Sequence, residues 1–496
     1  MKQPGFNFDS TKFRHALMNL PETAAKEDLE PPALTDIYVP AMHSKALSPE
    51  VSIVEGMRGS GKSFWTAVLA NDKACKFALD TASVKGLSAS IVKVGFGLSE
   101  DNTDFPSANR ITSLLDQGCK PDSIWRSVLM RHALKTLNKK LPFKDSVSDS
   151  AIWVQNNRDK ADDLLVECDK NFSAQGKTLL LLFDSLDRLA NEWEQIRELL
   201  SSALRLCLEC RTRHALRIKF FLRPDMVEAD DEVWGFSDSS KLLHSKVPLE
   251  WRPTDLYGLI LLHLANNADV GRIFRDTLST KADIQWPAIE QAYPLPRSLT
   301  DSEQLVRGVI EALAGPWVGT SVKKGYTYTW IPTHLSDAKG RLSPRSILLA
   351  FKQAAIWTNK HRQNHTLPLH YEGIQQGVVE ASKIRINEIK EDYPWVGPLL
   401  EALNGATVPL SFAEMTERWT QNCINKSLII AKEKQRLPPR RYSSTPKKDK
   451  NKLEALVDDL VELAVLYRTD DNRLNMPDIF RVGFGIKRKG GVRPPR

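Results

Sequence analysis

Two kinds of block alternate along the first half of the chain. Short, almost purely apolar runs predict strands that are buried on both faces, as in a parallel sheet covered by helices. These runs lie at 51–55, 90–97, 179–183 and 217–223, and the more polar segment 245–253 is expected to add a fifth strand. Longer segments with helical spacing separate them, at 122–137, 159–172 and 193–212. Strands that alternate with helices predict an α/β fold with a doubly wound parallel sheet.

The C-terminal third has a different pattern. From about residue 366 the chain predicts several helices, and then a stretch rich in proline, serine and charge at 436–452, which predicts an exposed loop or wing. A hairpin is expected around 469–473, followed by an end strand. Helices followed by a small hairpin predict a winged-helix-like α+β domain. The expected divisions are an N-terminal arm (1–45), a core (46–255), a helical lid (256–365) and this C-terminal domain (366–496).

Charge changes the picture only near the C-terminus. The net charge of the chain is +8, but Lys432–Lys452 alone carries nine basic and two acidic residues, and Lys487–Arg496 carries five basic residues and no acid. We therefore expect an anionic partner at these two segments. A nucleic-acid backbone and a partner protein are both compatible with them. No apolar run approaches the roughly 18 residues of a membrane span, so we expect no membrane association and a cytoplasmic location.

Cysteine spacing adds little chemistry. Of six cysteines, only Cys207 and Cys210 are closely spaced, and no second pair lies at the distance expected for a zinc site. Both fall in a predicted helix. Reduced, structural thiols are therefore the expectation.

A phosphate-binding loop follows the first predicted strand. The segment "GMRGSGKS" matches G-x-x-x-x-G-K-[ST], and it lies between an apolar strand and a helix-forming run, as that motif requires. Glycines let the backbone approach phosphate oxygens, inward-facing amides form an anion nest, and the next helix adds its positive end. Lys62 is expected on the β and γ oxygens and Ser63 on Mg²⁺. The expected nucleotide contacts are Gly56, Gly59, Ser60, Gly61, Lys62, Ser63 and Phe64.

Two other strand ends carry polar residues. The strand at 179–183 is followed by Asp184, which we expect to join Ser63 in the Mg²⁺ shell. Asp187 is either the group that orients or deprotonates the attacking water or an ordinary acid at a helix start. Arg223, at the tip of the fourth strand, is either a sensor of the γ-phosphate or a surface arginine.

The combined motifs resemble those of bacterial P-loop ATPases near the STAND and KAP groups, within the broad AAA+-like branch. The resemblance is carried by "GMRGSGKS", "LLLLFDSLDRL", "FFLRPD" and "LEWRPTDLYGLILLHL" and covers roughly residues 36–360. It implies ATP and Mg²⁺ as ligands. It also implies that Arg345, at the start of a lid helix, reads the nucleotide. A role in anti-phage defence beside a separate effector, and assembly into a homo-oligomer, are further expectations of the resemblance.

The sequence departs from that family at one catalytic position. AAA+ motors of this kind place glutamate directly after the metal aspartate, where this chain has Ser185. An arginine finger is also not assigned; Arg211 and Arg213, at the end of a long helix, are possible donors to a neighbouring subunit. An ATP-hydrolysing switch, a nucleotide-bound scaffold without turnover and an ATP-dependent DNA-binding regulator therefore all remain open.

Other P-loop classes fit the motifs less well. A GTPase favours D-x-x-G where this chain has "DSLD", and "TKAD" at 280–283 only loosely matches its base-reading motif. No "LSGGQ"-like signature of ABC ATPases is present.

Overall fold

The computed structural model describes residues 5–22, 30–97, 103–190, 193–227, 231–433, 438–446 and 451–489. Its contacts divide the chain into two compact units. Ala24–Glu250 forms one, here called the sheet unit. Met1–Thr23 and Trp251–Arg496 together form the other, here called the helical unit.

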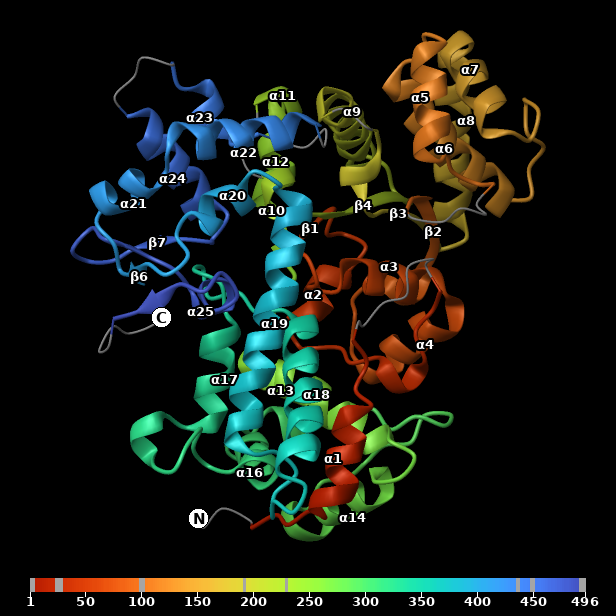
Figure 1. Cartoon of the computed structure of the whole chain (residues 1–496). Coiled ribbons are helices and arrows are strands. Elements are labelled where there is room, and N and C mark those ends of the chain that lie inside the picture. The colour runs from red at the N-terminus through yellow and green to blue at the C-terminus, as the bar shows by residue number, and fades with distance from the viewer. Residues whose placement is uncertain are drawn as a thin grey trace. The chain divides into compact units, whose positions relative to one another are not determined.

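The sheet unit is built on five parallel strands. The strands are β1 (Ile53–Glu55), β2 (Ser90–Phe96), β3 (Thr178–Phe183), β4 (Leu216–Leu222) and β5 (Val247–Pro248). Their order across the sheet is β2-β3-β4-β1-β5, with every neighbouring pair parallel (Figure 1). All five strands expected from the apolar runs are present, so the predicted doubly wound α/β fold is confirmed. The carboxyl ends of all five strands consequently meet at one edge of the sheet.

Helices cover both faces of this sheet, and its residues are therefore buried on both sides. Leu179, Leu181 and Phe183 pack into one core cluster with residues of the helices at 121–136, 158–174 and 193–211, while Leu180 and Leu182 are equally buried on the opposite face. The larger helices are α3 (Lys62–Ala70), α4 (Asp72–Thr81), α5 (Ala108–Asp116), α6 (Pro121–Thr136), α7 (Val147–Asn156), α8 (Arg158–Ala174) and α9 (Trp193–Arg211). Four short helices are α2 (His43–Leu47), α10 (Pro224–Val227), α11 (Asp231–Trp234) and α12 (Ser239–His244).

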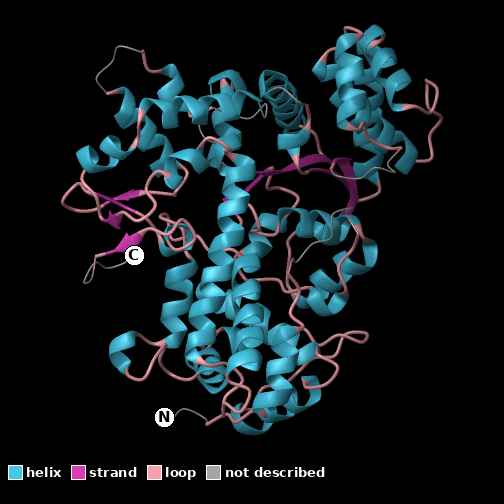
Figure 2. Ribbon diagram, viewed as in Figure 1, coloured by secondary structure: helices cyan, strands magenta, loops and turns pink. Residues whose placement is uncertain are grey.

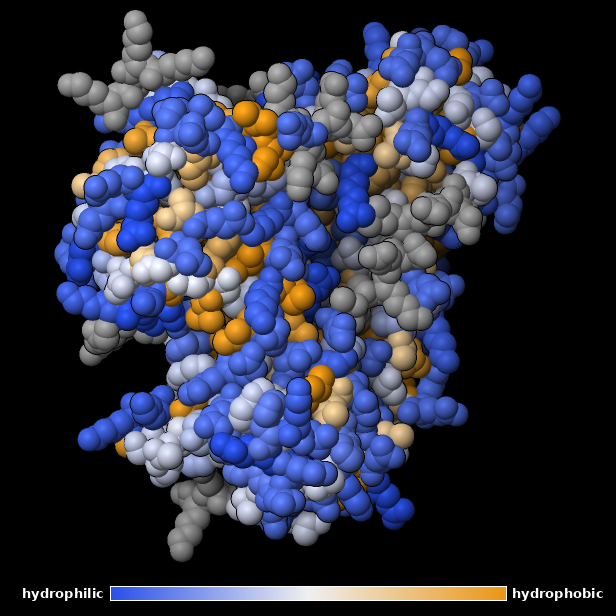
Figure 3. All heavy atoms as spheres, viewed as in Figure 1, coloured by the Kyte–Doolittle hydropathy of each residue, from blue (hydrophilic) through white to orange (hydrophobic). Residues whose placement is uncertain are grey.

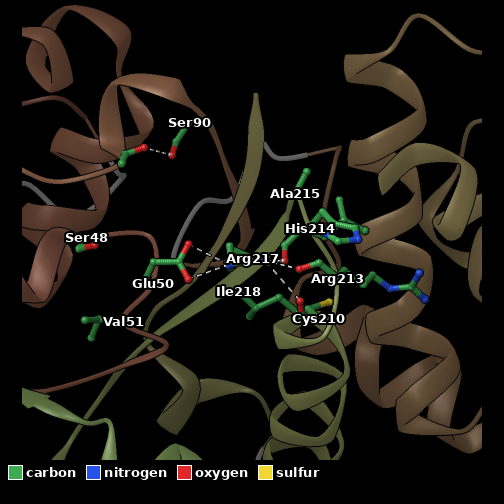
Figure 4. A network of polar contacts seen from close by, with 12 residues as sticks. Ser48, Glu50, Val51, Ser90, Cys210, Arg213, His214, Ala215, Arg217 and Ile218 are labelled. Atoms are coloured by element: carbon green, nitrogen blue, oxygen red, sulfur yellow. Dashed lines mark hydrogen bonds and ion pairs between the residues drawn. The ribbon is translucent and has the colours of Figure 1, made fainter. Parts of the chain in front are cut away.

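Arg217 fastens the amino-terminal end of this sheet. Its guanidinium donates to both carboxylate oxygens of Glu50, at 3.1 and 3.2 Å, and to the carbonyl of Arg213 at 2.9 Å (Figure 4). A further bond reaches the carbonyl of Cys210 in the last turn of α9. Because the last carbonyls of a helix lack intrahelical partners, Arg217 both caps α9 and holds the segment that enters β1.

The helical unit has two long helices at its centre. Helices α18 (Pro344–His361) and α19 (Tyr371–Asp392) lie side by side along their lengths (Figure 1). N-terminal helix α1 (Ser10–Met18) packs against α18, so the first residues of the chain belong to this unit. The other helices up to that pair are α13 (Pro253–Asn266), α14 (Gly271–Ala282), α15 (Arg297–Thr300), α16 (Glu303–Ala314) and α17 (Thr327–Leu335).

The C-terminal part of the helical unit is α+β and winged-helix-like, as predicted. Strands β7 (Tyr467–Arg468) and β8 (Leu474–Asn475) form an antiparallel hairpin after α24 (Lys452–Glu462), and β6 (Thr407–Val408) pairs in parallel with β9 (Lys487–Arg488) (Figure 2). The remaining helices are α20 (Val396–Glu401), α21 (Phe412–Arg418), α22 (Gln421–Glu433), α23 (Arg440–Ser444) and α25 (Asp478–Arg481).

The basic segment expected as an exposed loop is in part a packed helix, and this corrects the prediction. Its residues 440–444 form α23 against α24, where the Asp459 carboxylate accepts from the backbone N–H groups of Arg441 and Tyr442 at 2.9 and 3.0 Å. Arg441 also pairs with Glu462. The expected basic surface depends largely on other lysines and arginines of these segments. Those residues, at 434–437, 447–450 and 490–496, lie outside the described residues.

Hydrophilic residues dominate the face of the molecule shown in Figure 3, with hydrophobic residues in small groups between them. Within the described part of the chain, every helix is too short or too polar to cross a bilayer.

Candidate functional site

The loop between β1 and α3 has the backbone geometry that phosphate binding needs. Gly59 and Gly61 adopt φ values of +77° and +104°, which L side chains rarely adopt. Gly56 is needed for a different reason, because a Cβ there would collide with the hydroxyl of Ser60. The amide of Gly56 donates to the carbonyl of Leu222 at 2.9 Å, which joins the loop to the end of β4. The loop is thus a tight turn held at the carboxyl edge of the sheet.

Lys62 and Ser63 begin α3 at that loop. The Lys62 ammonium donates to the carbonyls of Gly56 and Met57, at 2.7 and 3.0 Å, so its charge lies within the curve of the loop. Phe64 follows and is buried, with its ring edge-on to Trp65 at 5.4 Å between centroids. Phe64 therefore packs within the sheet unit.

Asp184 meets Ser63 at the edge of the sheet. The backbone of Asp184 continues the β2–β3 pairing by donating to the carbonyl of Phe96 at 3.0 Å, and its side chain is buried. Burial raises the pKa of Asp184, and a hydrogen bond from the Ser63 hydroxyl and the charge of Lys62 oppose that rise. Residues 62–63 and 184, far apart in sequence, are therefore neighbours, as the two motifs predict.

Asp187 and Arg223 also come together. Asp187 lies in a short 3-10 turn after Ser185, which adopts a left-handed φ of +56°. Arg223, directly after β4, binds the Asp187 carboxylate at 3.3 Å. The charge of Asp187 in turn contributes to the raised pKa of Asp184. The candidate base Asp187 and the candidate γ-phosphate sensor Arg223 are thus an ion pair beside the expected metal ligand.

The sequence did not single out Asp225, which completes this group. Arg223 and Asp225 form a two-pronged pair, with Nε–Oδ1 at 3.0 Å and Nη2–Oδ2 at 2.9 Å. A bidentate pair of this kind fixes the plane of a guanidinium. The only signal in the sequence was that Arg223 and Asp225 lie two positions apart in "RPD". That spacing is too common to identify a site.

The two arginines considered as fingers differ in their surroundings. Arg211 donates to the carbonyl of Lys241 at 3.0 Å and to the hydroxyl of Ser245 at 3.1 Å, so it fastens α9 to α12. The Arg213 guanidinium extends away from the Arg217 network (Figure 4). Among the described residues no hydrogen-bond partner is found for that guanidinium.

Arg345 belongs to the helical unit and is held there. Its guanidinium pairs with Glu388 of α19, which also binds Arg385 at 3.0 Å. Burial raises the pKa of Glu388, but the two arginines outweigh it and hold that pKa below its usual range. In this arrangement Arg345 ties α18 to α19.

The donor set at the sheet edge fits a hard divalent cation. Oδ1 of Asp184 is buried and, within the described residues, has no hydrogen-bond partner. A carboxylate oxygen beside a serine hydroxyl is the ligand pair that Mg²⁺ takes in phosphate-loop sites. Fold and loop together define the chain as a P-loop NTPase.

Comparison with known proteins shows no close relationship. No family model matches the chain, and no curated protein matches it. Three archaeal structures are similar to it at low TM-score. Cdc6p of Pyrobaculum aerophilum has 12% identity and a TM-score of 0.28, with 87% of this chain and 84% of that chain covered. The ORC2 protein of Aeropyrum pernix, solved with ADPNP and ADP, has 13% identity and a TM-score of 0.34 over 87% and 85%. A Walker-type ATPase of Pyrococcus abyssi has 12% identity and a TM-score of 0.38 over 94% and 99%.

Proposed function

We propose that this protein binds Mg·ATP and hydrolyses it as a conformational switch. One observation carries the proposal: Lys62, Ser63 and Asp184 meet at the carboxyl edge of the sheet, beside the Asp187–Arg223 pair. A phosphate loop with no catalytic neighbours would support binding alone. Here a carboxylate and a guanidinium lie next to the expected metal ligand.

Each group has a distinct role in this proposal. The loop amides and Lys62 bind the phosphates, and the open Oδ1 of Asp184, with Ser63, provides the metal ligands. When bound, Mg²⁺ neutralises part of the negative charge on the phosphates. Asp187 positions the attacking water and accepts its proton, while Arg223 contacts the γ-phosphate and is kept in plane by Asp225.

Phosphate release from ATP tests the proposal. We expect Lys62→Ala to lower the hydrolysis rate about 10²–10³-fold, since it removes a charge aimed at the transferred phosphoryl group. Asp184→Asn should lower it by a similar factor and weaken its dependence on Mg²⁺. Lys76→Ala and Asp80→Asn, on the exposed face of the neighbouring helix α4, are the matched controls and should leave the rate unchanged. A wild-type rate in Lys62→Ala would rule out hydrolysis at this loop.

A scaffold that binds nucleotide without turnover is the second candidate. Ser185 replaces the expected glutamate, and the Asp187 carboxylate is already engaged by Arg223. If Asp187 is the base, Asp187→Asn should bind ATP normally and lose about 10²–10⁴-fold in rate. Tight ATP binding by the wild type without turnover, alone or with DNA, RNA or partner proteins, would favour the scaffold.

The biological setting is proposed from the motif resemblance alone. On that basis the chain belongs to the STAND–KAP branch, assembles as a homo-oligomer in the cytoplasm and serves a defence system with a separate effector. Lys432–Lys452 and Lys487–Arg496 are proposed to contact nucleic acid or a partner protein. In the same scheme residues 256–365 act as the lid, with Arg345 as its nucleotide sensor after release from Glu388.

A further inference from the structure

The loop between α16 and α17, residues 315–326, is ordered by its own backbone and plays no part in nucleotide binding as proposed above. Trp317 and Tyr326 face each other across an antiparallel bridge. The amide of Val318 donates to Gly325 and that of Thr327 to Pro316, both at 3.0 Å. We call this segment the aromatic–basic loop. Its shape is that of a short hairpin, fixed at its base.

The residues that hold the aromatic–basic loop in place differ from those that it exposes to solvent. Val318 and Thr327 are buried and hold the base of the hairpin. Trp317, Val322 and Tyr326 are 38%, 48% and 44% exposed. Large apolar side chains exposed together on an ordered loop are a sign of a binding surface. The rings cannot be explained by packing, because the loop is already held by its backbone and its buried residues.

The charge of this loop is positive. Lys323 and Lys324 are exposed at the tip, and no ion pair is found for either within the described residues. No acidic residue occurs from Gly315 to Ser336. Gly319 lets the stem of Lys324 cross the loop, because a Cβ there would lie 2.7 Å from Lys324 Cγ. The loop that exposes the aromatic rings therefore also exposes two lysines.

The ring of Tyr326 is covered by a cation on one face, and the residue is 44% exposed. Arg307 of α16 lies over that face, 4.9 Å from the ring centroid, and its charge is balanced by Glu311 at 2.8 Å, with Glu303 also acting on it. A cation against one face keeps the ring in place. The free charge of the surface therefore comes from the two lysines at the tip.

We propose that the aromatic–basic loop binds single-stranded nucleic acid. Unpaired bases stack on Trp317 and Tyr326, and phosphates lie against Lys323 and Lys324. A duplex fits poorly, because the faces of its bases are covered by their neighbours. An anionic membrane fits less well than a single strand, because the loop exposes only two aliphatic side chains, those of Pro316 and Val322. This surface is separate from the C-terminal basic segments and does not depend on ATP hydrolysis.

Fluorescence anisotropy of the full-length protein with labelled 20-nucleotide DNA and RNA strands, and with the matching duplex, tests the inference. We expect Trp317→Ala and Tyr326→Leu each to weaken single-strand binding about 5–100-fold, and Trp317→Phe to retain it. Replacing both lysines by alanine should reduce the slope of log affinity against log salt by about 1.4. Ile273→Ala and Lys360→Ala remove an exposed apolar and an exposed basic side chain elsewhere in the helical unit and should bind as wild type does.

Three results would overturn the inference. The first is single-strand binding by Trp317→Ala and Tyr326→Leu at wild-type affinity. The second is a duplex bound as tightly as a single strand. The third is binding to phosphatidylserine vesicles, lost in the same variants, in a protein that binds no oligonucleotide. Circular dichroism confirms that each variant is folded, and Tyr326→Leu keeps the apolar bulk. Lys62→Ala should bind the single strand as wild type does. A failure of the single-strand proposal can therefore be distinguished from a failure of the ATPase proposal.

Discussion

Lys219 lies on β4 with its side chain completely buried, and among the described residues no carboxylate pairs with it. Its ammonium donates to the carbonyls of Ala46, Ser48 and Val51, at 2.7, 2.9 and 2.6 Å. Burial lowers the pKa of Lys219 to about 7. Three acceptors match the three donors of an ammonium, so this lysine holds the segment that leads into β1 and the phosphate loop.

Lys219→Met should destabilise the protein by roughly 2–5 kcal/mol. Removing a buried charge is favourable in itself, but the variant leaves the buried carbonyls of Ala46 and Val51 without their donor, at about 1–3 kcal/mol each, while the Ser48 carbonyl keeps the amide of Val51. The second effect is the larger, and urea denaturation measures it. Lys246→Met is the control, since its exposed pair with Glu55 contributes less than about 1 kcal/mol. A variant as stable as wild type would show that those carbonyls do not depend on Lys219.

His132 makes stability depend on pH. It is buried on α6, and burial lowers its pKa to about 4, although Asp104 and the Val94 backbone oppose the shift. The unfolded chain has a histidine pKa near 6.5, so below that pH it binds a proton that the folded protein does not. Stability is therefore complete above about pH 6.5 and falls by up to about 3 kcal/mol as the pH approaches 4.

Urea midpoints between pH 7 and pH 4.5 test this effect. His132→Gln should flatten the decline relative to wild type, but not abolish it, because burial also lowers the pKa of His263 to about 4. His244→Gln, an exposed control, should decline as wild type does. Parallel wild-type and His132→Gln curves would contradict the assignment.

Individual site residues could be predicted only where their partners belong to local motifs, and not where their partners lie far away in the sequence. Lys62, Ser63 and Asp184 could be found because each belongs to a local motif whose position in the fold is fixed by a strand end. Lys219 could not, because its acceptors lie 168 to 173 residues away in sequence. A lysine in an apolar run gives no indication of which carbonyls surround it.

At the scale of elements, the local pattern of apolar and polar residues was enough to predict the strands of the sheet and its longer helices. The apolar run 179–183 became β3 (Thr178–Phe183), and the amphipathic run 122–137 became α6 (Pro121–Thr136). The short helices α10, α11 and α12 were not predicted, since a single turn has no period to detect and depends on tertiary contacts. Helix α23 was missed for the same reason, because the carboxylate of Asp459 that caps it comes from α24.

The close packing of α18 and α19 depends on two glycines. A Cβ at Gly377 would fall well inside the contact distance of the Ala350 carbonyl oxygen, and one at Gly373 would lie 2.7 Å from the Ala354 carbonyl oxygen. Alanine normally stabilises a helix interior over glycine by about 1 kcal/mol. Here we expect Gly377→Ala to destabilise by roughly 1–3 kcal/mol, because the added methyl forces the two backbones apart.

Thermal unfolding gives the sign of that change. Gln375→Ala, on the exposed side of α19, is the matched control and should shift stability by less than about 0.5 kcal/mol. A higher melting temperature for Gly377→Ala would show that the helices tolerate a wider separation.

At the scale of the whole molecule, the chain order and the spatial order differ. The chain begins in the helical unit, passes through the sheet unit and returns. Arg14 of α1 is buried and donates to four carbonyls of the loop after α18, those of Gln363, His365, Leu367 and Pro368, at 2.7 to 3.2 Å. The rings of Phe8 and Phe13, from the same N-terminal segment, pack with that of Phe274 in α14. Residues at the start of the chain therefore stabilise helices that lie more than 300 positions later.

This threading predicts that a change near the N-terminus affects one unit and spares the other. Arg14→Ala removes the donors of four carbonyls and should cost about 3–5 kcal/mol, seen as faster proteolysis within 251–433. ATP binding, measured by calorimetry, should persist and weaken no more than it does in Arg345→Ala, because the phosphate loop and Asp184 belong to the sheet unit and only the proposed Arg345 contact comes from the helical unit. Lys12→Ala, on the exposed side of α1, should change neither quantity. If Arg14→Ala instead lost ATP affinity while its proteolysis within 251–433 stayed slow, residues 5–22 would serve the nucleotide site and not the helical unit with which they pack.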